Sequence, residues 1–504
     1  MAAMDATKVA GCFKDRTILV TGSTGFLAKL VVEKILRVQP DVKKLYLLVR
    51  APDNAAARQR VLHEILGKEL FNVLRAKHGA DFHSFIQEKI SSLAGDVAHQ
   101  NLGLENTRAQ QLFEEIDIIV HGAATTNFYE RYDVALASNT FGTAHICQFA
   151  RQCSHLKLLL HISTAYVVRL QKGQLLEKPL ELGQPLKKGR HLDIEAELKL
   201  ANEFRAKFMK DHSGADSSQK LEKVAMKELG FKRAKYFGWP NTYAFTKAMG
   251  EMLLGAMRGD LPVVIVRPSM VISTFEDPFP GWIEGIRTMD ALIVASYEQR
   301  LPCFITGSVL DSIPGDMVVN AMMVAMATHY NDVGAQVVYH VTSALQNPLS
   351  CNLLGESIYA YCLINPRVRD DKRTIIQHKR PILFSRYAYF YTYVVLAYKT
   401  RLQVLYAVNY LLLRGRLTEY HSKLNRSLNY LMSTAKFYAP YIFFKGCFDD
   451  TNLRTLWGTT GARHGDGYIF NFDSSCVDWR LYLFNTHIPA VLKVAADMKK
   501  QGRA

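Results

Sequence analysis

The chain has 504 residues, of which 49% are hydrophobic, and this length exceeds what one ordinary hydrophobic core accommodates, so two domains are expected. The eight cysteines include no close pair with metal-ligand spacing, which argues against a metal site and favours a reducing compartment without a disulfide framework. About fifteen residues precede the first apolar run and contain no secretory h-region, so we expect an intracellular protein.

A glycine-rich turn between two apolar segments gives the first indication of function. Residues 18–20 are an apolar run that predicts a buried strand, and the apolar periodicity of residues 26–38 predicts a helix. Because a tight glycine turn before a helix N-terminus can cradle phosphate, this arrangement favours a dinucleotide site over a turn without a ligand. The residues expected to contact the dinucleotide are Thr21, Gly22, Thr24, Gly25, Phe26 and Leu27.

The residue after the second apolar run indicates which dinucleotide is bound. Arg50 ends the predicted strand of residues 45–50, and arginine there suits the 2′-phosphate of NADP, whereas a solvated strand-end charge is the alternative. Residues 53–92 look helical and charged. Further strands are predicted at residues 93–97, 116–120, 158–165 and 263–267. The residues at or after strand ends that we expect to contact the cofactor are Asp96, Val97, Ala123, Thr125 and Arg267, and Asn139, early in a predicted helix, is expected to contact it as well.

Four residues form a candidate catalytic group. Tyr243 and Lys247 are spaced i, i+4 and therefore share one face of a helix, while Ser163 and Thr164 end a predicted strand. A phenol has a pKa near 10, which an adjacent ammonium lowers, so Lys247 is expected to activate Tyr243 as a proton donor and to hold the nicotinamide ribose. A strand-end hydroxyl would bind the carbonyl oxygen of the substrate, and no metal is needed.

The order of these motifs, together with three stretches near the carboxyl terminus, is that of a known family. The residues that carry the resemblance are 21–28, 48–50, 163–167, 241–247, 266–269, 448–452, 470–473 and 478–479. On these residues the sequence resembles the plant alcohol-forming fatty acyl-CoA reductases, the male-sterility type family of extended short-chain dehydrogenases/reductases. The resemblance covers nearly the whole chain. Analogy with extended relatives favours Thr164 over Ser163 as the catalytic hydroxyl.

The resemblance implies both a fold and a reaction. The fold is α/β, with a doubly wound parallel-sheet Rossmann domain in residues 12–365, which contains a polar insertion at about 169–237, and a mainly helical C-terminal domain in residues 366–504. The reaction is NADPH-dependent reduction of a long-chain acyl-CoA, or of an acyl-carrier-protein thioester, to a primary alcohol through an aldehyde. Its products would serve wax, suberin or sporopollenin-type lipids. Acyl chain length and oligomeric state are left open.

Two other functions remain open from the sequence. The first is reduction of another substrate by the same fold, either stopping at an aldehyde or acting on a sterol, flavonoid or nucleotide sugar. The second is a non-catalytic scaffold that binds NADP or acyl-CoA. The family-like C-terminal stretches argue against the first alternative, and the intact Thr164, Tyr243 and Lys247 argue against the second.

Three segments have more than one interpretation. Val168 and Arg169 stand where the family usually has Asn-Gly, and a side chain there disfavours positive φ, so this loop is expected to affect acyl specificity. The insertion contains predicted helices at residues 195–210 and 218–229, which form either a solvated surface subdomain or a lid. The apolar segments that either line an acyl groove or belong to the ordinary core are residues 291–296 and 316–326.

A basic, tyrosine-rich block lies in the C-terminal region. Residues 366–445 contain 15 Lys/Arg, three Asp/Glu and 11 of the 24 tyrosines, so they carry +12 of the net charge of +16. The uncharged stretches 387–398 and 403–413 are too short to span a bilayer and predict two helices that either lie in a membrane interface or pack on the first domain. The block lacks a nucleic-acid motif, and it would alternatively hold the CoA phosphates.

Peripheral membrane contact through residues 386–414 would suit the cytosolic face of the endoplasmic reticulum. The C-terminal residues are not a peroxisomal tripeptide, and the sequence does not separate the endoplasmic reticulum from peroxisome or plastid.

Overall fold

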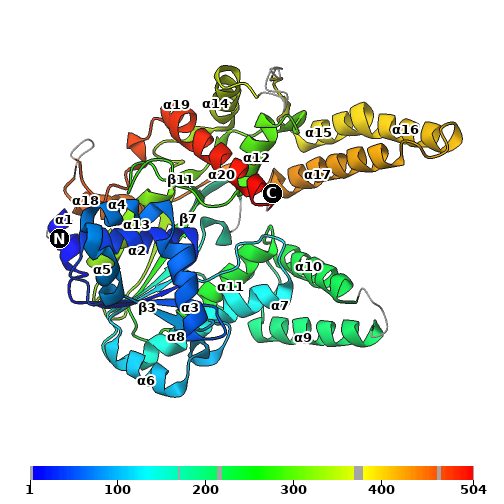
Figure 1. The fold of residues 1–504 in the computed structure, drawn as a ribbon. Coiled ribbons are helices and arrows are strands. Elements are labelled where there is room, and N and C mark those ends of the chain that lie inside the picture. The colour runs from blue at the N-terminus through cyan, green and yellow to red at the C-terminus, as the bar shows by residue number, and fades with distance from the viewer. Residues whose placement is uncertain (1–3, 169–170, 213–217, 368–377, 463–466, 503–504) are drawn as a thin grey trace.

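The computed structural model describes residues 4–168, 171–212, 218–367, 378–462 and 467–502 (Figure 1). Arg169, which the sequence singles out in the loop after Thr164, lies outside these residues. A parallel sheet fills the centre of the molecule, helices flank it, and two pairs of helices project from the same side (Figure 1).

The central sheet has seven strands in the order β12-β7-β5-β4-β1-β2-β3, and all of its pairs are parallel. The order reverses between β1 and β4, and open α/β sheets bind ligands beyond the carboxyl ends of the strands at such a point. This confirms the doubly wound parallel sheet. The strands are β1 (Thr17–Thr21), β2 (Lys44–Val49), β3 (Ile90–Ala94), β4 (Ile118–His121), β5 (Leu158–Ile162), β7 (Val263–Pro268) and β12 (Gln336–Val341).

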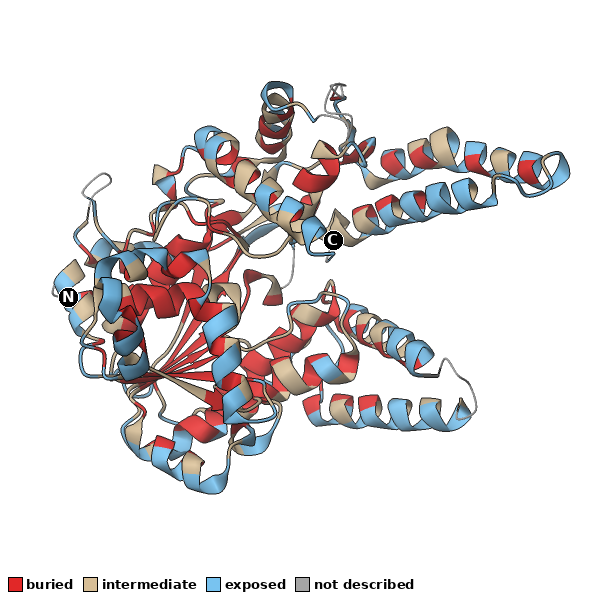
Figure 2. Cartoon of the chain, in the orientation of Figure 1, coloured by how far each residue is buried: buried red, intermediate tan, exposed pale blue. Residues whose placement is uncertain are grey.

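Helices cover both faces of this sheet, and the buried strands lie between them (Figure 2). Successive residues of β1 point to opposite faces, so Ile18 and Val20 join one core whereas Leu19 joins the other. The helical segments of this part are α1 (Ala6–Gly11), α2 (Phe26–Val38), α3 (Asn54–Arg60), η1 (Val61–Leu66), η2 (Glu69–Phe71), α4 (Asn72–His78), η3 (Gly79–Asp81), α5 (Phe82–Lys89), η4 (Gln100–Gly103), α6 (Asn106–Glu115), α7 (Tyr132–Ala135), η5 (Leu136–Phe141), α8 (Gly142–Gln152), η6 (Ala165–Val167), α11 (Thr242–Met257) and α13 (Gly315–Thr328).

One boundary of the predicted helical stretch 53–92 is wrong. The helices end with α5 at Lys89, and residues 90–92 already belong to β3, where Leu45 of β2 pairs with Ile90. The polar residues Ser91 and Ser92 conceal this strand in the sequence because β3 is the edge of the sheet and is only half-buried at those positions.

The C-terminal region is mainly helical, and it also supplies strands to the first part of the chain. β14 (Ile382–Phe384) pairs with β9 (Cys303–Ile305), and β15 (Gly446–Phe448) pairs with β6 (Gly173–Leu175). Two helices precede this region, α12 (Thr288–Tyr297) and α14 (Cys351–Ile364). Its own helical segments outside the projecting pair described below are α18 (Thr451–Thr459), η8 (Ser474–Cys476), α19 (Trp479–Tyr482), η9 (Leu483–His487) and α20 (Ile488–Lys500). The remaining short strands are β8 (Met270–Ile272), β10 (Val309–Leu310), β11 (Ser312–Pro314) and β13 (Leu349–Ser350).

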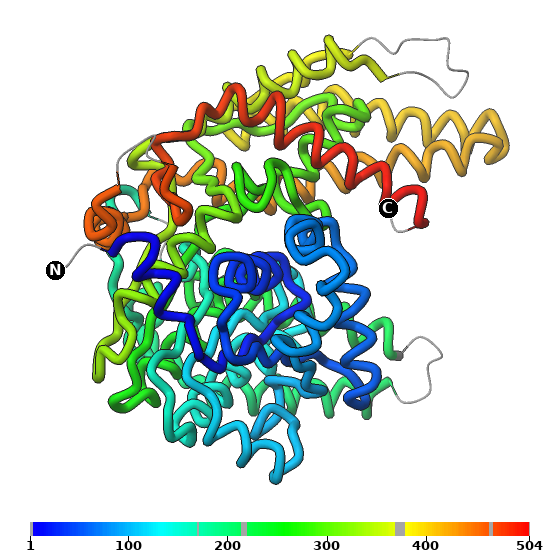
Figure 3. The backbone as a smooth tube through the Cα atoms, turned by 60° about the vertical axis from the view of Figure 1, so that its left-hand side comes forward, coloured from blue at the N-terminus to red at the C-terminus, as the bar shows by residue number. Residues whose placement is uncertain are grey.

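The two parts also share a hydrophobic core. Leu453 of α18 and Val491 of α20 belong to the same buried cluster as Val20 of β1. The main-chain N–H of Met4 donates to the carbonyl of Thr459 at the end of α18, which joins the N-terminal residues to the C-terminal region, and Figure 3 places the N-terminus beside that helix. The division at residues 365 and 366 stays a prediction, and the shared core makes the two parts interdependent.

The polar insertion forms one projecting pair, α9 (Ile194–Asp211) and α10 (Ser218–Phe237), so both helices predicted there are present. We call this pair the insertion arm. Its base is held by buried carboxylates: Glu197 accepts from the hydroxyl of Tyr132 at 2.7 Å, and Glu222 accepts from Arg131 at 2.8 Å. These contacts fix the insertion arm beside α7 and α11.

The second projecting pair corrects the prediction of two separate helices at 387–398 and 403–413. Residues 387–411 form one continuous helical run, α15 (Tyr387–Val394), η7 (Val395–Lys399) and α16 (Thr400–Leu411), and its partner is α17 (Thr418–Ile442). Lys399 and Arg401 interrupt the apolar pattern but not the helix, because both residue types are good helix formers. We call residues 387–442 the basic arm. Among the described residues, none of the helices has the length and apolar content needed to cross a membrane.

Candidate functional site

The turn between β1 and α2 leaves room for a phosphate because two of its residues lack side chains. Gly22 has a φ of +68°, and a Cβ there would lie 2.6 Å from the main-chain nitrogen of Ala123 at the end of β4. The N–H of Gly25 donates to the carbonyl of Gly22 at 2.8 Å, and α2 begins at the next residue. The positive end of α2 and its unpaired N–H groups lie at the crevice, so these residues fit the pyrophosphate of a dinucleotide.

Buried hydroxyls hold this turn in place. The hydroxyl of Ser23 donates to main-chain carbonyls of β1 at 2.8 Å and β2 at 3.1 Å. Thr21 Oγ1 bonds to His121 Nδ1 at 2.8 Å and accepts from the N–H of Ala123 at 3.3 Å. The side chain of Thr21 therefore supports the turn, whereas Thr24 is half-buried beside it. Sequence reasoning missed Ser23, because its two partners become visible only in the folded chain.

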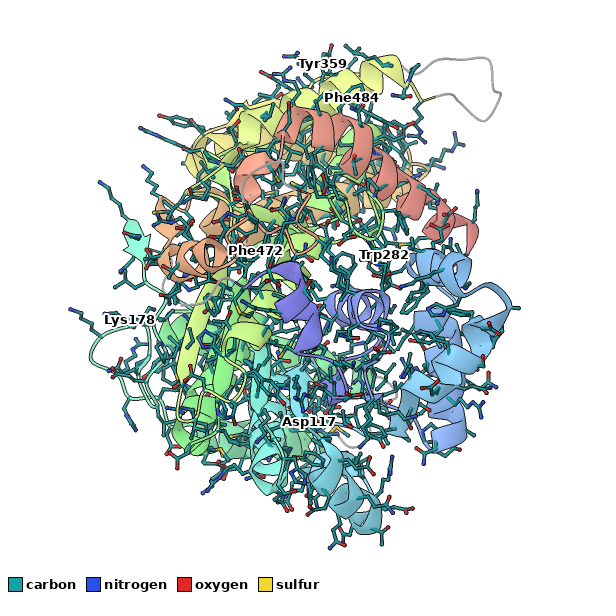
Figure 4. All side chains as sticks on the ribbon, turned by 90° about the vertical axis from the view of Figure 1, so that its left-hand side faces the viewer. Asp117, Lys178, Trp282, Tyr359, Phe472 and Phe484 are labelled. Carbon is teal, nitrogen blue, oxygen red and sulfur yellow. The ribbon has the colours of Figure 1, made fainter. Side chains whose placement is uncertain are left out.

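Phe26 and Leu27 begin α2 and are half-buried. The ring of Phe26 stacks on Trp282 with centroids 4.9 Å apart and an angle of 8° between the rings. Figure 4 shows Trp282 between α2 and the C-terminal helix α20. Phe26 therefore ties the N-terminus of the phosphate-facing helix to the part of the chain that follows β7.

Arg50, Asp96 and Val97 follow the carboxyl ends of β2 and β3. Arg50 is exposed, and its carbonyl accepts from Arg60 at 2.6 Å. The carboxylate of Asp96 is half-buried and accepts from the N–H of Ala98 at 3.0 Å. Val97 is buried, and its carbonyl is bound by a histidine of α8 at 2.8 Å. Arg50 is therefore exposed just beyond the carboxyl end of β2, and its contact with a 2′-phosphate stays a prediction.

Asn139 organises the loop that follows β4. It lies in η5 and is fully buried; its Oδ1 accepts from the N–H of Thr125 at 2.9 Å, and its Nδ2 donates to the carbonyl of Thr125 at 3.1 Å and to Thr246 Oγ1 at 3.0 Å. The adjacent α11 approaches closely because of Gly250, where a Cβ would lie 2.3 Å from the Asn139 carbonyl. Asn139 therefore joins the loop of Ala123 and Thr125 to the helix of Tyr243, and its Nδ2 makes two hydrogen bonds.

Tyr243 and Lys247 lie on α11, as the spacing predicts. The N-cap residue Asn241 accepts from the N–H of Ala244 at 2.9 Å, which fixes the start of this helix. Lys247 is buried, and its Nζ donates to the carbonyl of Ile162 at 2.8 Å and lies 3.2 Å from His161 Nε2. The end of β5 thus holds the Lys247 ammonium directly beside the Ser163–Thr164 strand end.

The charges around Tyr243 differ from the expectation. Burial raises the pKa of Tyr243 to about 12, and the charge that opposes this rise is Arg287 rather than Lys247. Burial lowers the pKa of Lys247 to about 8, although Glu251 opposes this. The pKa of His161 is held well below its usual value by burial and by Lys247, so neutral His161 accepts the Lys247 hydrogen bond. Arg287, at the start of α12, is a residue that sequence reasoning missed.

The two strand-end hydroxyls have different surroundings. Thr164 lines a pocket together with Tyr243, and its Oγ1 accepts from the N–H of Tyr166 at 3.4 Å. Ser163 does not belong to the described lining of that pocket, and its buried hydroxyl has no hydrogen-bond partner within the described parts of the chain. This placement supports Thr164 as the hydroxyl that meets a substrate.

The pocket has a volume of about 830 Å³ and lies between the sheet and the C-terminal region. Its size falls within the range of small-molecule sites. Apolar side chains of α12 and α14 line it, as do the ends of β8 and β9, whereas the described part of α13 does not contribute. Of the two apolar segments that the sequence left open, residues 291–296 therefore contribute to the lining of the pocket, and residues 316–326 belong to the ordinary core. None of the described residues of the insertion arm lines the pocket, which favours a surface subdomain over a lid.

Aromatic rings from distant parts of the chain close the pocket over Tyr243. Phe128, in the loop after β4, stacks on Tyr243 with centroids 5.6 Å apart and on Phe437 of α17 at 5.5 Å. The hydroxyl of Tyr441, also on α17, accepts a hydrogen bond from Asn241. Sequence reasoning missed these three aromatic residues because they are 115 to 198 positions away from Tyr243.

The structure does not bring the Arg267 side chain to the cofactor crevice, which corrects the prediction for this residue. Arg267 and Glu251 are both 0% exposed; the guanidinium Nε lies 3.1 Å from each carboxylate oxygen of Glu251, and Nη2 forms a further bond. Nη1 lies 3.3 Å from His340 Nε2. A buried ion pair with this geometry is a structural link between β7, α11 and β12.

Comparisons with known proteins place this site in a family. Two family models, both described as male sterility protein, match residues 20–322 and 402–496. The chain is 46% identical to fatty acyl-CoA reductase 1 of Arabidopsis thaliana and 41% identical to the alcohol-forming fatty acyl-CoA reductase of Simmondsia chinensis, and each match covers 95% of this chain and 97% of the relative.

The fold has a solved counterpart. The reductase domain of a non-ribosomal peptide synthetase from Mycobacterium tuberculosis superposes with a TM-score of 0.55 at 17% identity, covering 100% of this chain and 97% of that one. At this identity the likeness concerns the fold alone. The family models and the relatives together show that this chain is an oxidoreductase that belongs to the male-sterility type fatty acyl-CoA reductase family.

Proposed function

We propose that this protein reduces the thioester of a long-chain acyl-CoA, or of an acyl-carrier protein, to a primary alcohol through an aldehyde, with NADPH as the reductant. The observation that carries the proposal is that Thr164 and Tyr243 open onto one largely apolar pocket of about 830 Å³. An apolar groove that ends at a proton donor and a hydroxyl suits a fatty acyl chain whose carbonyl lies at that end.

The reaction consists of two reductions at one carbonyl carbon, and bound NADPH would supply the hydride in each. Thr164 and Tyr243 bind the carbonyl oxygen, and Tyr243 gives it a proton as the first C–H bond forms, which yields a hemithioacetal. The C–S bond then breaks, the CoA thiol leaves, and an aldehyde remains. The O–H proton of the hemithioacetal leaves on the thiol sulfur, so Tyr243 takes up a proton from solvent before it protonates the aldehyde oxygen in the second reduction, for which a second NADPH would bind. Lys247 holds positive charge beside the site throughout.

Product analysis tests this proposal directly. The purified protein with NADPH and a series of acyl-CoA lengths, including palmitoyl- and stearoyl-CoA, should consume two NADPH per thioester and release the fatty alcohol. Aldehyde as the final product, with one NADPH consumed, would replace the alcohol-forming function by an aldehyde-forming one. Absence of turnover with every thioester would instead favour a binding scaffold.

Arg50 provides a test of the preference for NADPH. Replacement of Arg50 by Ala should lower kcat/KM for NADPH by about 10- to 100-fold, because a charge-assisted hydrogen bond to the 2′-phosphate is lost. The value for NADH, which lacks this phosphate, should change by less than about twofold. Arg58→Ala, at another exposed arginine eight residues further along the chain on α3, serves as the matched control. Equal losses for both cofactors would contradict the assignment.

Lys247 makes the reaction dependent on pH. Since burial lowers the pKa of Lys247 from 10.5 to about 8, the ammonium is present below this pH and is lost above it. We expect kcat/KM to fall with an apparent pKa near 8 on the basic side, measured from about pH 6 to about pH 10. Tyr243 titrates too high to cause this fall.

The variant Lys247→Arg separates the ammonium from other basic groups. A guanidinium keeps its charge over the whole range, so the remaining activity of the variant should show no fall near pH 8. If kcat/KM of this variant still falls near pH 8, another group controls the pH dependence.

We also propose that the protein acts at the cytosolic face of the endoplasmic reticulum. Long-chain acyl substrates and fatty alcohols partition into membranes, and the basic arm offers a positive surface to anionic lipids.

A further inference from the structure

The basic arm ends in an exposed apolar turn that no described part of the chain covers. Tyr410, Leu411 and Leu412 are 72%, 72% and 74% exposed. Figures 1 and 3 show this end of the arm projecting away from the rest of the molecule. We call residues 410–416 the apex. Consecutive side chains of this type that face water represent apolar surface whose burial would be favourable.

Hydrogen bonds hold the turn at the apex in a defined conformation. Asn409 is buried, its Oδ1 accepts from the N–H of Leu417 at 2.7 Å, and its Nδ2 donates to Thr418 Oγ1 at 3.2 Å. Thr418 Oγ1 in turn donates to the carbonyl of Gly415 at 2.7 Å. Gly415 has a φ of +82°, which turns the chain from α16 into α17. Because these bonds pin both sides of the turn, the leucines are held outward.

The rest of the arm is stably packed, so its exposed end is not the edge of an unfolded segment. Phe390, Val394 and Leu402 from the first half of the arm meet Leu428 and Leu431 of α17 in one buried cluster. The same cluster includes β9, which joins the arm to the body of the molecule.

The charge around the apex is strongly positive. Residues 386–436 contain one carboxylate, Glu419, and eight basic residues: Arg386, Lys399, Arg401, Arg414, Arg416, Lys423, Arg426 and Lys436. Arg414 and Arg416 belong to the apex itself, and both are exposed. Apolar side chains flanked by arginine match the two layers of an anionic membrane surface, since leucine reaches the acyl boundary while arginine stays at the phosphates.

We propose that the apex, residues 410–416, inserts into the surface of an anionic phospholipid bilayer and holds the protein there. The contact is a point insertion, whereas the sequence predicts helices lying along the interface through residues 386–414. The choice of a lipid surface as partner rests on the proposed function, because a membrane is where a long-chain acyl substrate is concentrated. α17 leads from the apex to Phe437 and Tyr441, so the docked end of the arm is connected through one helix to a wall of the pocket.

Vesicle binding tests the proposal on the full-length protein. Sedimentation with vesicles of phosphatidylcholine containing about 30 mol % phosphatidylserine should recover the wild-type protein, and vesicles of phosphatidylcholine alone should recover at least about tenfold less. The double variant Leu411→Ser/Leu412→Ser should lose at least about tenfold in binding to anionic vesicles. The pair Arg414→Gln/Arg416→Gln should lose about tenfold at low salt, and the difference should shrink as salt screens the charge.

Matched controls separate the apex from exposed apolar residues in general. Val333 and Ile364 are 69% and 70% exposed, lie outside the arm, and should tolerate Val333→Ser/Ile364→Ser with unchanged vesicle binding. Retention of full binding by the leucine double variant, or equal loss in this control, would overturn the proposal. So would wild-type dimerisation that disappears in the leucine variant, because the apex would then contact a second copy.

Turnover of a short-chain, water-soluble acyl-CoA distinguishes failure of this inference from failure of the proposed function. The apex variants should retain wild-type turnover of that substrate, since the apex does not line the pocket. Vesicle binding without turnover of any thioester would reject the proposed function and leave the docking surface intact. Normal turnover without selective binding to anionic vesicles would reject the docking surface and leave the proposed function intact.

Discussion

Replacement of Tyr243 by Phe should lower kcat by about 10²- to 10⁴-fold, because the variant keeps the ring but lacks the proton that both reductions require. The ring itself is held by its stacking on Phe128, so the pocket should keep its shape and the KM for acyl-CoA should change little. Steady-state kinetics with NADPH and palmitoyl-CoA, combined with a cofactor-binding titration, measure both quantities.

The control for this experiment is a second tyrosine of the same pocket. Tyr438 lines the pocket from α17, and its hydroxyl makes no hydrogen bond among the described contacts. Tyr438→Phe should therefore leave kcat within about twofold of the wild-type value. A loss of kcat in Tyr438→Phe as large as that in Tyr243→Phe would contradict the special role of Tyr243 as proton donor.

Glu251→Ala should lower the free energy of unfolding by about 3 to 5 kcal/mol, because it leaves the Arg267 guanidinium buried without its carboxylate. Both side chains are 0% exposed, so water cannot replace the lost partner. The link joins β7 to α11, the helix that carries Tyr243 and Lys247, and activity should fall together with stability. Urea unfolding, or the thermal midpoint at a fixed heating rate, measures the change.

Two further variants show whether the cost arises from the unpaired charge. The double variant Glu251→Met/Arg267→Met removes both charges and should be more stable than Glu251→Ala, since two apolar side chains of similar size can pack together. Glu228→Ala breaks an exposed i, i+4 pair with Lys232 and should change stability by less than about 0.5 kcal/mol. Equal effects of Glu228→Ala and Glu251→Ala would contradict the argument.

The central sheet was predictable because local sequence and burial agree there. Residues 18–20 are apolar throughout, and the structure buries them from both faces, as a central parallel strand requires. Gly22 and Gly25 were also predictable, because the local backbone of the turn requires residues without a Cβ, independently of long-range packing. The i, i+4 spacing likewise places Tyr243 and Lys247 on one helix face.

Contacts that depend on long-range packing were not predictable. The sequence shows Arg267 at the end of a strand, where we expected it to contact the cofactor, but its partner Glu251 faces it from α11. Arg287 influences the pKa of Tyr243 because the folded chain brings the residue before α12 close to α11, and the sequence does not reveal this approach. In the basic arm, Lys399 and Arg401 look like helix ends, although the helix continues through them.

The strand pairs that join the two parts of the chain limit how substrate preference could be transferred between relatives. β14 completes β9, β15 completes β6, and α17 supplies one wall of the pocket while α12 and α14 supply another. A chimera that exchanges residues 366–504 alone would replace the α17 wall of the pocket and the strands β14 and β15. It would keep β9, β6 and the opposite wall of the pocket, against which the exchanged elements must pack. Chain-length selectivity is therefore a joint property of both parts, and the exchange of a whole preference requires matched changes on either side of the pocket.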